Sequence, residues 1–162
     1  MSELANLYNQ SIEPLQITDF SGALKGRHNL YDQISYVLKN AEERVDLVTS
    51  EEGLLRKLNT LKPLIERTVA RGIKIRILAP ENPESQKIIA SFGENVKFKN
   101  SGDFKGRFCL VDNKQIIFML TDDEEVHPSY DMGFWINSNY FSGTMSTMFE
   151  KVWNSDLSSE SE

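Results

Sequence analysis

Short apolar strands alternate with amphipathic helices through most of this sequence, and the clearest unit of this kind spans residues 44–80. An apolar run at 45–48 is followed by a helical pattern over 51–71, which Pro63 either kinks or restarts. The next run, 73–78, alternates isoleucine with basic residues, as a strand with one covered face does. A strand, a helix and a second strand in this order are typical of α/β proteins.

The rest of the sequence continues this alternation. Apolar spacing predicts further helices over 29–44, 84–92 and 139–153, and further strands over 95–100, 106–112, 115–121 and 132–137. The segment Asp112-Asn113-Lys114 joins two of these strands as a hairpin. This order predicts an α/β fold in which a mixed β-sheet is flanked by helices.

The composition excludes several classes of protein. The chain has 162 residues and a formal net charge of −6, which predicts poor nonspecific binding to nucleic acid. The use of a single cysteine predicts a cytoplasmic protein. It shows neither an apolar run long enough for a membrane span nor the apolar core of a signal peptide. The single cysteine, Cys109, fits a reducing compartment, and two histidines without CxxC or HExxH give no support for a metal site. We expect no cofactor and no membrane partner.

The distribution of apolar residues divides the chain into three predicted segments. Residues 1–22 are polar and are predicted to form an N-terminal connector or helix. Residues 23–154 carry the alternating pattern and are predicted to form one domain. Residues 155–162 are acidic and serine-rich, and we expect a disordered tail there.

The stretch FKGRFCLVDNK carries charged residues at a notable spacing. Lys105, Arg107 and Asp112 stand where the His-x-Lys-x4-Asp motif of the phospholipase D superfamily has its nucleophilic histidine, its phosphate-binding lysine and its aspartate. Lysine is protonated near neutral pH and is therefore a poor nucleophile in this position. The Gly-Ser pair of the motif falls on Met119 and Leu120, which have the character of core residues. The stretch predicts a site that keeps the spacing without the catalysis, and we expect no enzyme.

Four segments resemble the C-terminal effector domain of archaeal TrmB-like transcriptional regulators: 23–43, 44–80, 106–120 and 132–154, the last ending in FEKVWN. The resemblance implies a phospholipase D-like sandwich that senses a small molecule, commonly a sugar. In that family an N-terminal winged helix-turn-helix binds DNA. Residues 1–22 are too few for such a domain, so we expect DNA binding only through a domain that this sequence lacks.

The candidate ligand-binding residues are polar or charged groups at expected strand ends and in the motif: Thr49, Ser50, Glu51, Lys105, Arg107, Asp112, Asp131, Asn137 and Ser138. Ligands of α/β sheets bind beyond the C-terminal ends of parallel strands, and we expect these groups to meet there around a sugar or an anionic effector. Phe134 and Trp135 are adjacent in a strand and point to opposite faces, so both faces need cover. A homodimer would supply the second cover.

Other patterns allow two interpretations each. The basic residues at 74, 76, 97, 99, 105 and 107 either form an anion pocket or, as the alternation favours, face solvent. The acidic loop 122–131 is expected to be solvated rather than to bind a hard cation. For the whole chain the first hypothesis is a non-catalytic effector-sensing and dimerisation domain. The alternatives are a phosphodiesterase or nuclease of the phospholipase D superfamily and a purely structural dimerisation module.

Overall fold

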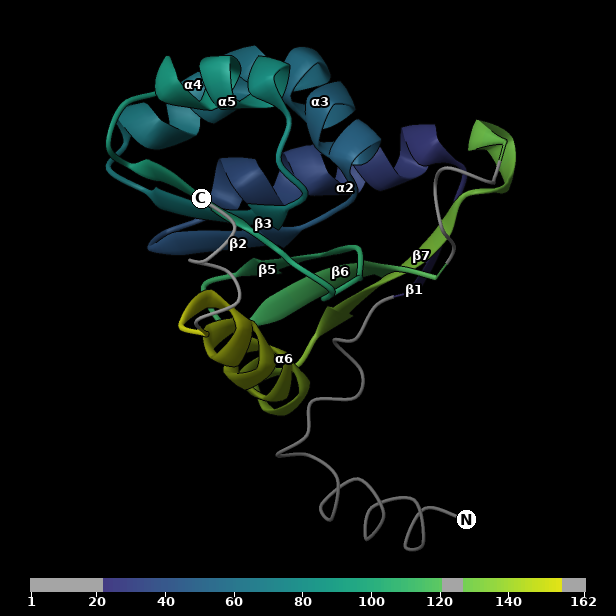
Figure 1. Cartoon of the computed structure of the whole chain (residues 1–162). Helices are drawn as coiled ribbons and strands as arrows, with labels where there is room; N and C mark the ends of the chain where they lie inside the picture. Colours follow the sequence, from purple (N-terminus) through teal and green to yellow (C-terminus); the bar gives the residue numbers. More distant parts are fainter. Residues whose placement is uncertain (1–21, 121–126, 156–162) are drawn as a thin grey trace, which may run out of the picture.

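A mixed β-sheet forms the centre of the molecule. The structure is a computed structural model that describes residues 22–120 and 127–155. In this part of the chain seven strands pair in the order β1-β7-β6-β5-β2-β3-β4 (Figure 1). The strands are β1 (Gly22–Lys25), β2 (Arg44–Val48), β3 (Lys74–Ala79), β4 (Val96–Asn100), β5 (Phe108–Val111), β6 (Gln115–Met119) and β7 (Met132–Asn137). The pairs β2–β3 and β3–β4 are parallel and the other neighbours are antiparallel, which confirms the predicted fold class.

Helices cover the two faces of the sheet unequally (Figure 1). One face carries α2 (Arg27–Asn40), α3 (Glu51–Thr60), α4 (Lys62–Ala70) and α5 (Pro83–Ala90). Among the described residues, α6 (Asn139–Trp153) is the helix that covers the other face, and a short 3-10 helix, η3 (Pro128–Tyr130), precedes β7. No helix within residues 22–120 and 127–155 is long and apolar enough to cross a membrane.

Three predicted helices differ from the observed ones: 29–44 is observed as Arg27–Asn40, 51–71 as two helices, and 84–92 as Pro83–Ala90. The first begins at Arg27 rather than at 29, because Gly26 adopts a positive φ that turns the chain into the helix and Asn29 donates to the Lys25 carbonyl. The stretch 51–71 divides into α3 and α4 around Leu61, since Pro63 lies in the first turn of α4.

Strand β1 was not predicted, because its four residues, GALK, are too few to display an alternation. It lies across the predicted boundary between residues 1–22 and 23–154. β1 pairs antiparallel with β7, so that Ala23 stands opposite Phe134.

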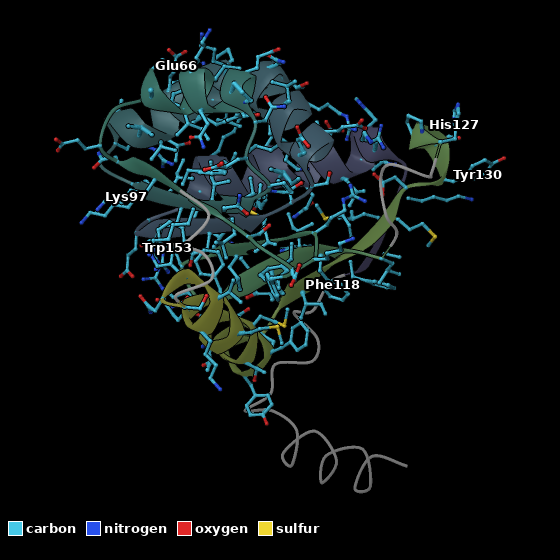
Figure 2. The ribbon with its side chains drawn as sticks, in the orientation of Figure 1. Glu66, Lys97, Phe118, His127, Tyr130 and Trp153 are labelled. Atoms are coloured by element: carbon cyan, nitrogen blue, oxygen red, sulfur yellow. The ribbon has the colours of Figure 1, made fainter. Side chains whose placement is uncertain are left out.

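The core has two parts, one on each face of the sheet. The larger lies under α2–α5 and is built from aliphatic side chains, among them Leu30, Val37, Leu54 and Ile77. The smaller lies under α6 and contains Val48, Leu78, Phe108, Leu110, Ile116, Phe149 and Trp153. Figure 2 shows Trp153 and Phe118 on this second side of the sheet. Trp135 packs against the larger part and Phe134 faces the other way against Phe118, as their adjacency predicted.

A half-buried arginine connects α6 to the sheet. Arg76 on β3 donates to both carboxylate oxygens of Asp46 on β2, at 2.8 and 3.1 Å. The same guanidinium bonds Glu150 on α6 and lies 4.8 Å from the centre of the Phe149 ring and 5.3 Å from that of Trp153. It therefore joins two strands, a carboxylate of α6 and two aromatic rings in one contact.

The Arg76–Glu150 contact predicts an acid-sensitive part of the stability. The hydrogen bond from Arg76 lowers the pKa of Glu150 below its ordinary value of 4.5. A lowered folded-state pKa contributes stability above pH 4.5, and this contribution is lost as the pH falls through the folded-state pKa. In Glu150→Gln we expect a shallower decline of Tm below that pH than in the wild type, measured by thermal unfolding across acidic buffers.

Asp46, a second carboxyl bonded by Arg76, also contributes to the pH dependence of stability. Burial raises the pKa of Asp46, so this group acts with the opposite sign in both proteins, and in the wild type the Glu150 charge adds to that rise. Parallel acid profiles of the two proteins would contradict the prediction for Glu150.

Candidate ligand-binding site

A cavity of about 400 Å³ opens at the edge of the sheet where the parallel strands end. It is lined by Thr49, Ser50, Glu51, Pro80, Ser101, Gly102, Phe104, Lys105, Gly106, Arg107, Met119 and Leu120. Five of the nine predicted ligand residues thus meet in one place: Thr49, Ser50, Glu51, Lys105 and Arg107. The volume lies within the range of small-molecule sites, about 300–1,000 Å³.

The first wall of the cavity is the turn from β2 into α3. Ser50 caps α3 and accepts a hydrogen bond from the Gly53 amide at 3.0 Å. Glu51 accepts a hydrogen bond from the Asn82 side chain at 2.7 Å, which ties this turn to the start of α5. Both contacts fix the backbone that presents Thr49 and Ser50 to the cavity.

Lys57 lies beneath this wall, and the sequence analysis missed it. The residue is only 2% exposed, its ammonium donates to Thr49 Oγ1 at 3.1 Å, and it lies 5.6 Å from the centre of the Tyr31 ring. A signal was present in the sequence, because Lys57 stands at helical spacing among Leu54, Leu58 and Leu61. A charged residue inside an apolar stripe is buried with partners or serves a function.

Arg107 belongs to a buried ion pair beside the cavity. Its guanidinium donates to both carboxylate oxygens of Asp131, each at 3.0 Å, and Arg27 Nε approaches the same carboxylate at 3.3 Å. Asp131 is completely buried, and its carbonyl also accepts the Gly26 amide. The prediction that 122–131 is solvated is therefore wrong for Asp131, because two cations hold its carboxylate inside the protein. The acidic residues 122–125 lie outside the described residues.

Lys105 stands at the rim of the cavity and is exposed. By sequence spacing alone, it takes the position of the nucleophilic histidine in the phospholipase D motif. Both histidines of the chain lie elsewhere, His28 at the start of α2 and His127 next to η3. Figure 2 shows His127 and Tyr130 projecting from the tip that precedes β7. The cavity lining as described therefore contains no imidazole.

Three predicted site residues lie at the opposite edge of the sheet. β7 runs antiparallel to β6, so Asn137 pairs with Gln115 at that edge, and Ser138 caps α6 by accepting the Phe141 amide at 3.2 Å. Asp112 follows β5, which runs antiparallel to β2. The expectation that these residues share an edge with Thr49 is wrong, because β5 and β7 end at the opposite edge, whereas the other described strands, β1, β2, β3, β4 and β6, end on the cavity side.

Asp112 has a structural role at that edge. With Asn113 it forms the predicted hairpin turn, in which both residues have positive φ, 56° and 57°. Its carboxylate accepts the backbone amides of Glu42, Glu43 and Arg44 at 2.7–2.9 Å. The aspartate of the motif spacing thus anchors the entry to β2 instead of reaching the cavity.

Some of the remaining basic residues face solvent and others are held by partners inside the protein. Lys74 and Lys97 face solvent as predicted, whereas Arg76 and Arg107 are held in ion pairs and Lys99 donates to the Trp153 carbonyl at 2.8 Å. Burial raises the pKa of the Cys109 thiol to about 12. Over residues 22–120 and 127–155, no three His, Cys, Asp or Glu side chains gather in a group that could hold a metal ion.

Known structures share this fold at low sequence identity. The archaeal chromatin protein TrmBL2 superposes with a TM-score of 0.67 at 19% identity, over 94% of this chain and 60% of that one. NucT from Helicobacter pylori matches with a TM-score of 0.67 at 12% identity, over 83% of this chain and 96% of NucT. Nuc from Salmonella typhimurium, a phospholipase D family member, matches with a TM-score of 0.58 at 13% identity, over 76% of this chain and 86% of Nuc.

The sequence itself gives no closer assignment. No protein-family model and no curated protein matches it. The chain spans about 60% of the length of TrmBL2. The mixed seven-stranded sheet with its flanking helices is nevertheless that of the phospholipase D-family structures, and this chain has the phospholipase D-like fold.

Proposed function

We propose that this chain is a non-catalytic regulatory domain that binds a small polar effector in the cavity at the ends of β2 and β4. The observation that carries the proposal is the lining of that cavity. Hydroxyls of Thr49 and Ser101, the Glu51 carboxylate and the cations of Lys105 and Arg107 surround a space of about 400 Å³, with Phe104 as an aromatic wall. Such a mixture of donors and acceptors beside an aromatic ring suits a sugar or an anionic metabolite.

We infer the wider biological role from the resemblance to TrmB-like regulators. The structural similarity to TrmBL2, an archaeal chromatin protein with a novel mode of DNA binding, supports this proposal. In our proposal the domain forms a homodimer in the cytoplasm and transmits effector binding to DNA only through a winged-helix domain outside this sequence. The effector would bind one of two arrangements of the dimer more tightly than the other. The free energy that couples effector binding to DNA binding would then be set by the difference between these two affinities.

Ligand binding gives the first test. We expect one member of a panel of sugars, sugar phosphates and nucleotides to raise Tm, since a ligand at 100 times its Kd stabilises by about 2.7 kcal/mol. Lys105→Ala should weaken the response to an anionic member without lowering the Tm of the free protein, because Lys105 is exposed. The exposed Lys97→Ala, on β4, is the matched control. A panel that leaves Tm unchanged throughout would favour a purely structural dimerisation module.

A phosphodiesterase is the second candidate, because NucT and Nuc share the fold. It requires a nucleophile in the cavity, where the motif position holds an exposed Lys105. We expect no cleavage of a phosphodiester reporter without added metal. Cleavage by the wild type that Lys105→Ala abolishes would establish the enzyme and refute the regulatory proposal.

A further inference from the structure

Lys57 places a charge in an apolar part of the protein. The residue is 2% exposed, and together with Ile34, Leu38 and Leu58 it lines a small void of about 30 Å³ between the helices and the sheet. Burial of an ammonium is costly, whereas a methionine of similar length would fill this space without a charge. Packing alone therefore does not require a lysine here, and its charge points to a function.

The ammonium of Lys57 is directed at Thr49. It donates to Thr49 Oγ1 at 3.1 Å, and Thr49, which is 3% exposed, lines the cavity of about 400 Å³. An ammonium has three donors and no acceptor, so the Thr49 oxygen accepts in this contact and its own hydrogen points elsewhere. Among the described residues none accepts that hydrogen. Thr49 therefore offers a donor to the cavity, and the positive charge behind its oxygen strengthens that donor.

Two other groups of the cavity lining also donate. Lys105 and Arg107 carry donors and no acceptor. Arg107 is held by two hydrogen bonds to Asp131, each 3.0 Å long, so its guanidinium has a fixed position. Glu51 is the one carboxylate in the described lining, and it accepts from the Asn82 side chain at 2.7 Å. This set of groups suits a ligand that carries an anionic oxygen together with neutral hydroxyls.

Further cations lie next to the cavity, around Tyr31. The centre of the Tyr31 ring is 5.6 Å from the Lys57 nitrogen. Burial raises the pKa of the Tyr31 hydroxyl, and the neighbouring Arg56, Arg27 and Arg107 act against that rise. These cations give the region a positive potential within a chain whose net charge is −6. Such a potential favours an anionic ligand over a neutral ligand of the same shape.

We propose that Lys57 is a positioning residue of this cavity, which fixes Thr49 as a donor and thereby selects an effector that carries an oxyanion, a phosphate or a carboxylate, over its neutral counterpart. The oxyanion accepts from Thr49 and Lys105, and Glu51 accepts from a hydroxyl of the same ligand. The inference rests on the proposed function and narrows its effector from a sugar or an anion to a hydroxylated anion.

Three ligands that share one pyranose ring test this selection. Glucose, glucose 6-phosphate and glucuronate carry a hydroxymethyl group, a phosphate ester and a carboxylate at the same position of the ring. Inorganic phosphate and acetate test the oxyanion alone. We expect calorimetric titration at constant ionic strength to give a Kd at least about tenfold lower for one of the two anionic sugars than for glucose. The tighter of the two shows whether the cavity takes a phosphate or a carboxylate.

Variants of Lys57 and Thr49 test the role of the lysine. Lys57→Met should raise the Kd of the anionic sugar at least about tenfold and leave that of glucose nearly unchanged. Thr49→Val should do the same, whereas Thr49→Ser keeps the hydroxyl and should retain the wild-type ratio. The double variant Lys57→Met with Thr49→Val should lose little more than either single variant, since the lysine acts through the threonine. Lys62→Met, which removes an exposed cation at the start of α4, is the matched control.

The outcomes separate this inference from the proposed function. Glucose bound as tightly as both anionic sugars overturns the inference and leaves the cavity as an effector site. An equal loss for all three sugars in Lys57→Met shows a merely structural lysine and overturns it as well, as do losses that add in the double variant. Binding of none of the five probes also overturns it. A Tm that stays unchanged across the wider panel of sugars, sugar phosphates and nucleotides overturns the proposed effector site too.

Discussion

Asp131→Ala is expected to lower the free energy of unfolding by about 3–5 kcal/mol, the cost of breaking a buried ion pair by removing one partner. Arg107 is 7% exposed, and its guanidinium donates two hydrogen bonds to the Asp131 carboxylate. The variant removes this carboxylate and leaves the buried guanidinium without it. It also removes the partner of Arg27 Nε. Urea unfolding followed by circular dichroism measures the change, and Tm should fall by roughly 10 °C or more.

Asp32→Ala provides the matched control for this variant. The Asp32 side chain is 66% exposed and contacts His28, which is 88% exposed, so its loss should change stability by no more than about 0.5 kcal/mol. Equal losses in the two variants would show that the Arg107–Asp131 pair is not a buried anchor. A double variant, Arg107→Met with Asp131→Leu, should recover part of the loss, because two apolar side chains leave no uncompensated charge at those positions.

The same ion pair links stability to the proposed site. Arg107 lines the cavity, and Asp131 sets the orientation of its guanidinium from behind. Asp131→Ala should therefore also weaken binding of an anionic effector at temperatures where the variant remains folded. The motif spacing pointed to Arg107, but the partner that fixes it stands 24 residues further along the chain, across a strand hairpin.

The local pattern of the sequence was sufficient to predict a helix, strand or turn where the element is long or has a clear period. The 73–78 run alternates and forms β3, and the turn residues Asp112 and Asn113 form the hairpin with the positive φ values that such turns need. Strand β1 escaped prediction because it depends on pairing with β7, which is distant in sequence. Its stability comes from tertiary context rather than from its own four residues.

The sequence located a site residue correctly only where it also indicated the direction of the strand that carries it. Thr49 follows a strand of the parallel group, and the rule for ligand sites at strand ends placed it correctly at the cavity. Asn137 also stands at the end of a strand, but β7 runs the opposite way, and an alternating pattern is the same in both directions. Strand order and direction are global properties, which explains why Asn137 and Ser138 were assigned to the wrong edge.

Arg76→Met is expected to cost a similar amount, about 3–5 kcal/mol, because it leaves the carboxylate of Asp46 buried with less compensation. Asp46 is 1% exposed, and the remaining cation, Arg44, approaches it at 3.3 Å from a side chain that is one-third exposed. Lys74→Met is the matched control, since Lys74 is an exposed cation two residues earlier on β3. Its loss should be within about 0.5 kcal/mol.

The loss in Arg76→Met should be concentrated in α6. Arg76 bonds Glu150 and lies over the rings of Phe149 and Trp153, whereas α2–α5 lie on the other face of the sheet (Figure 1). Amide hydrogen exchange should therefore quicken in α6 more than in α2, as expected for local opening of one element. Arg76→Lys should restore little, because an ammonium cannot bond two carboxylates in a planar fork while stacking on a ring. Exchange that quickens equally in α2 and α6 would show that α6 is not a separately held element.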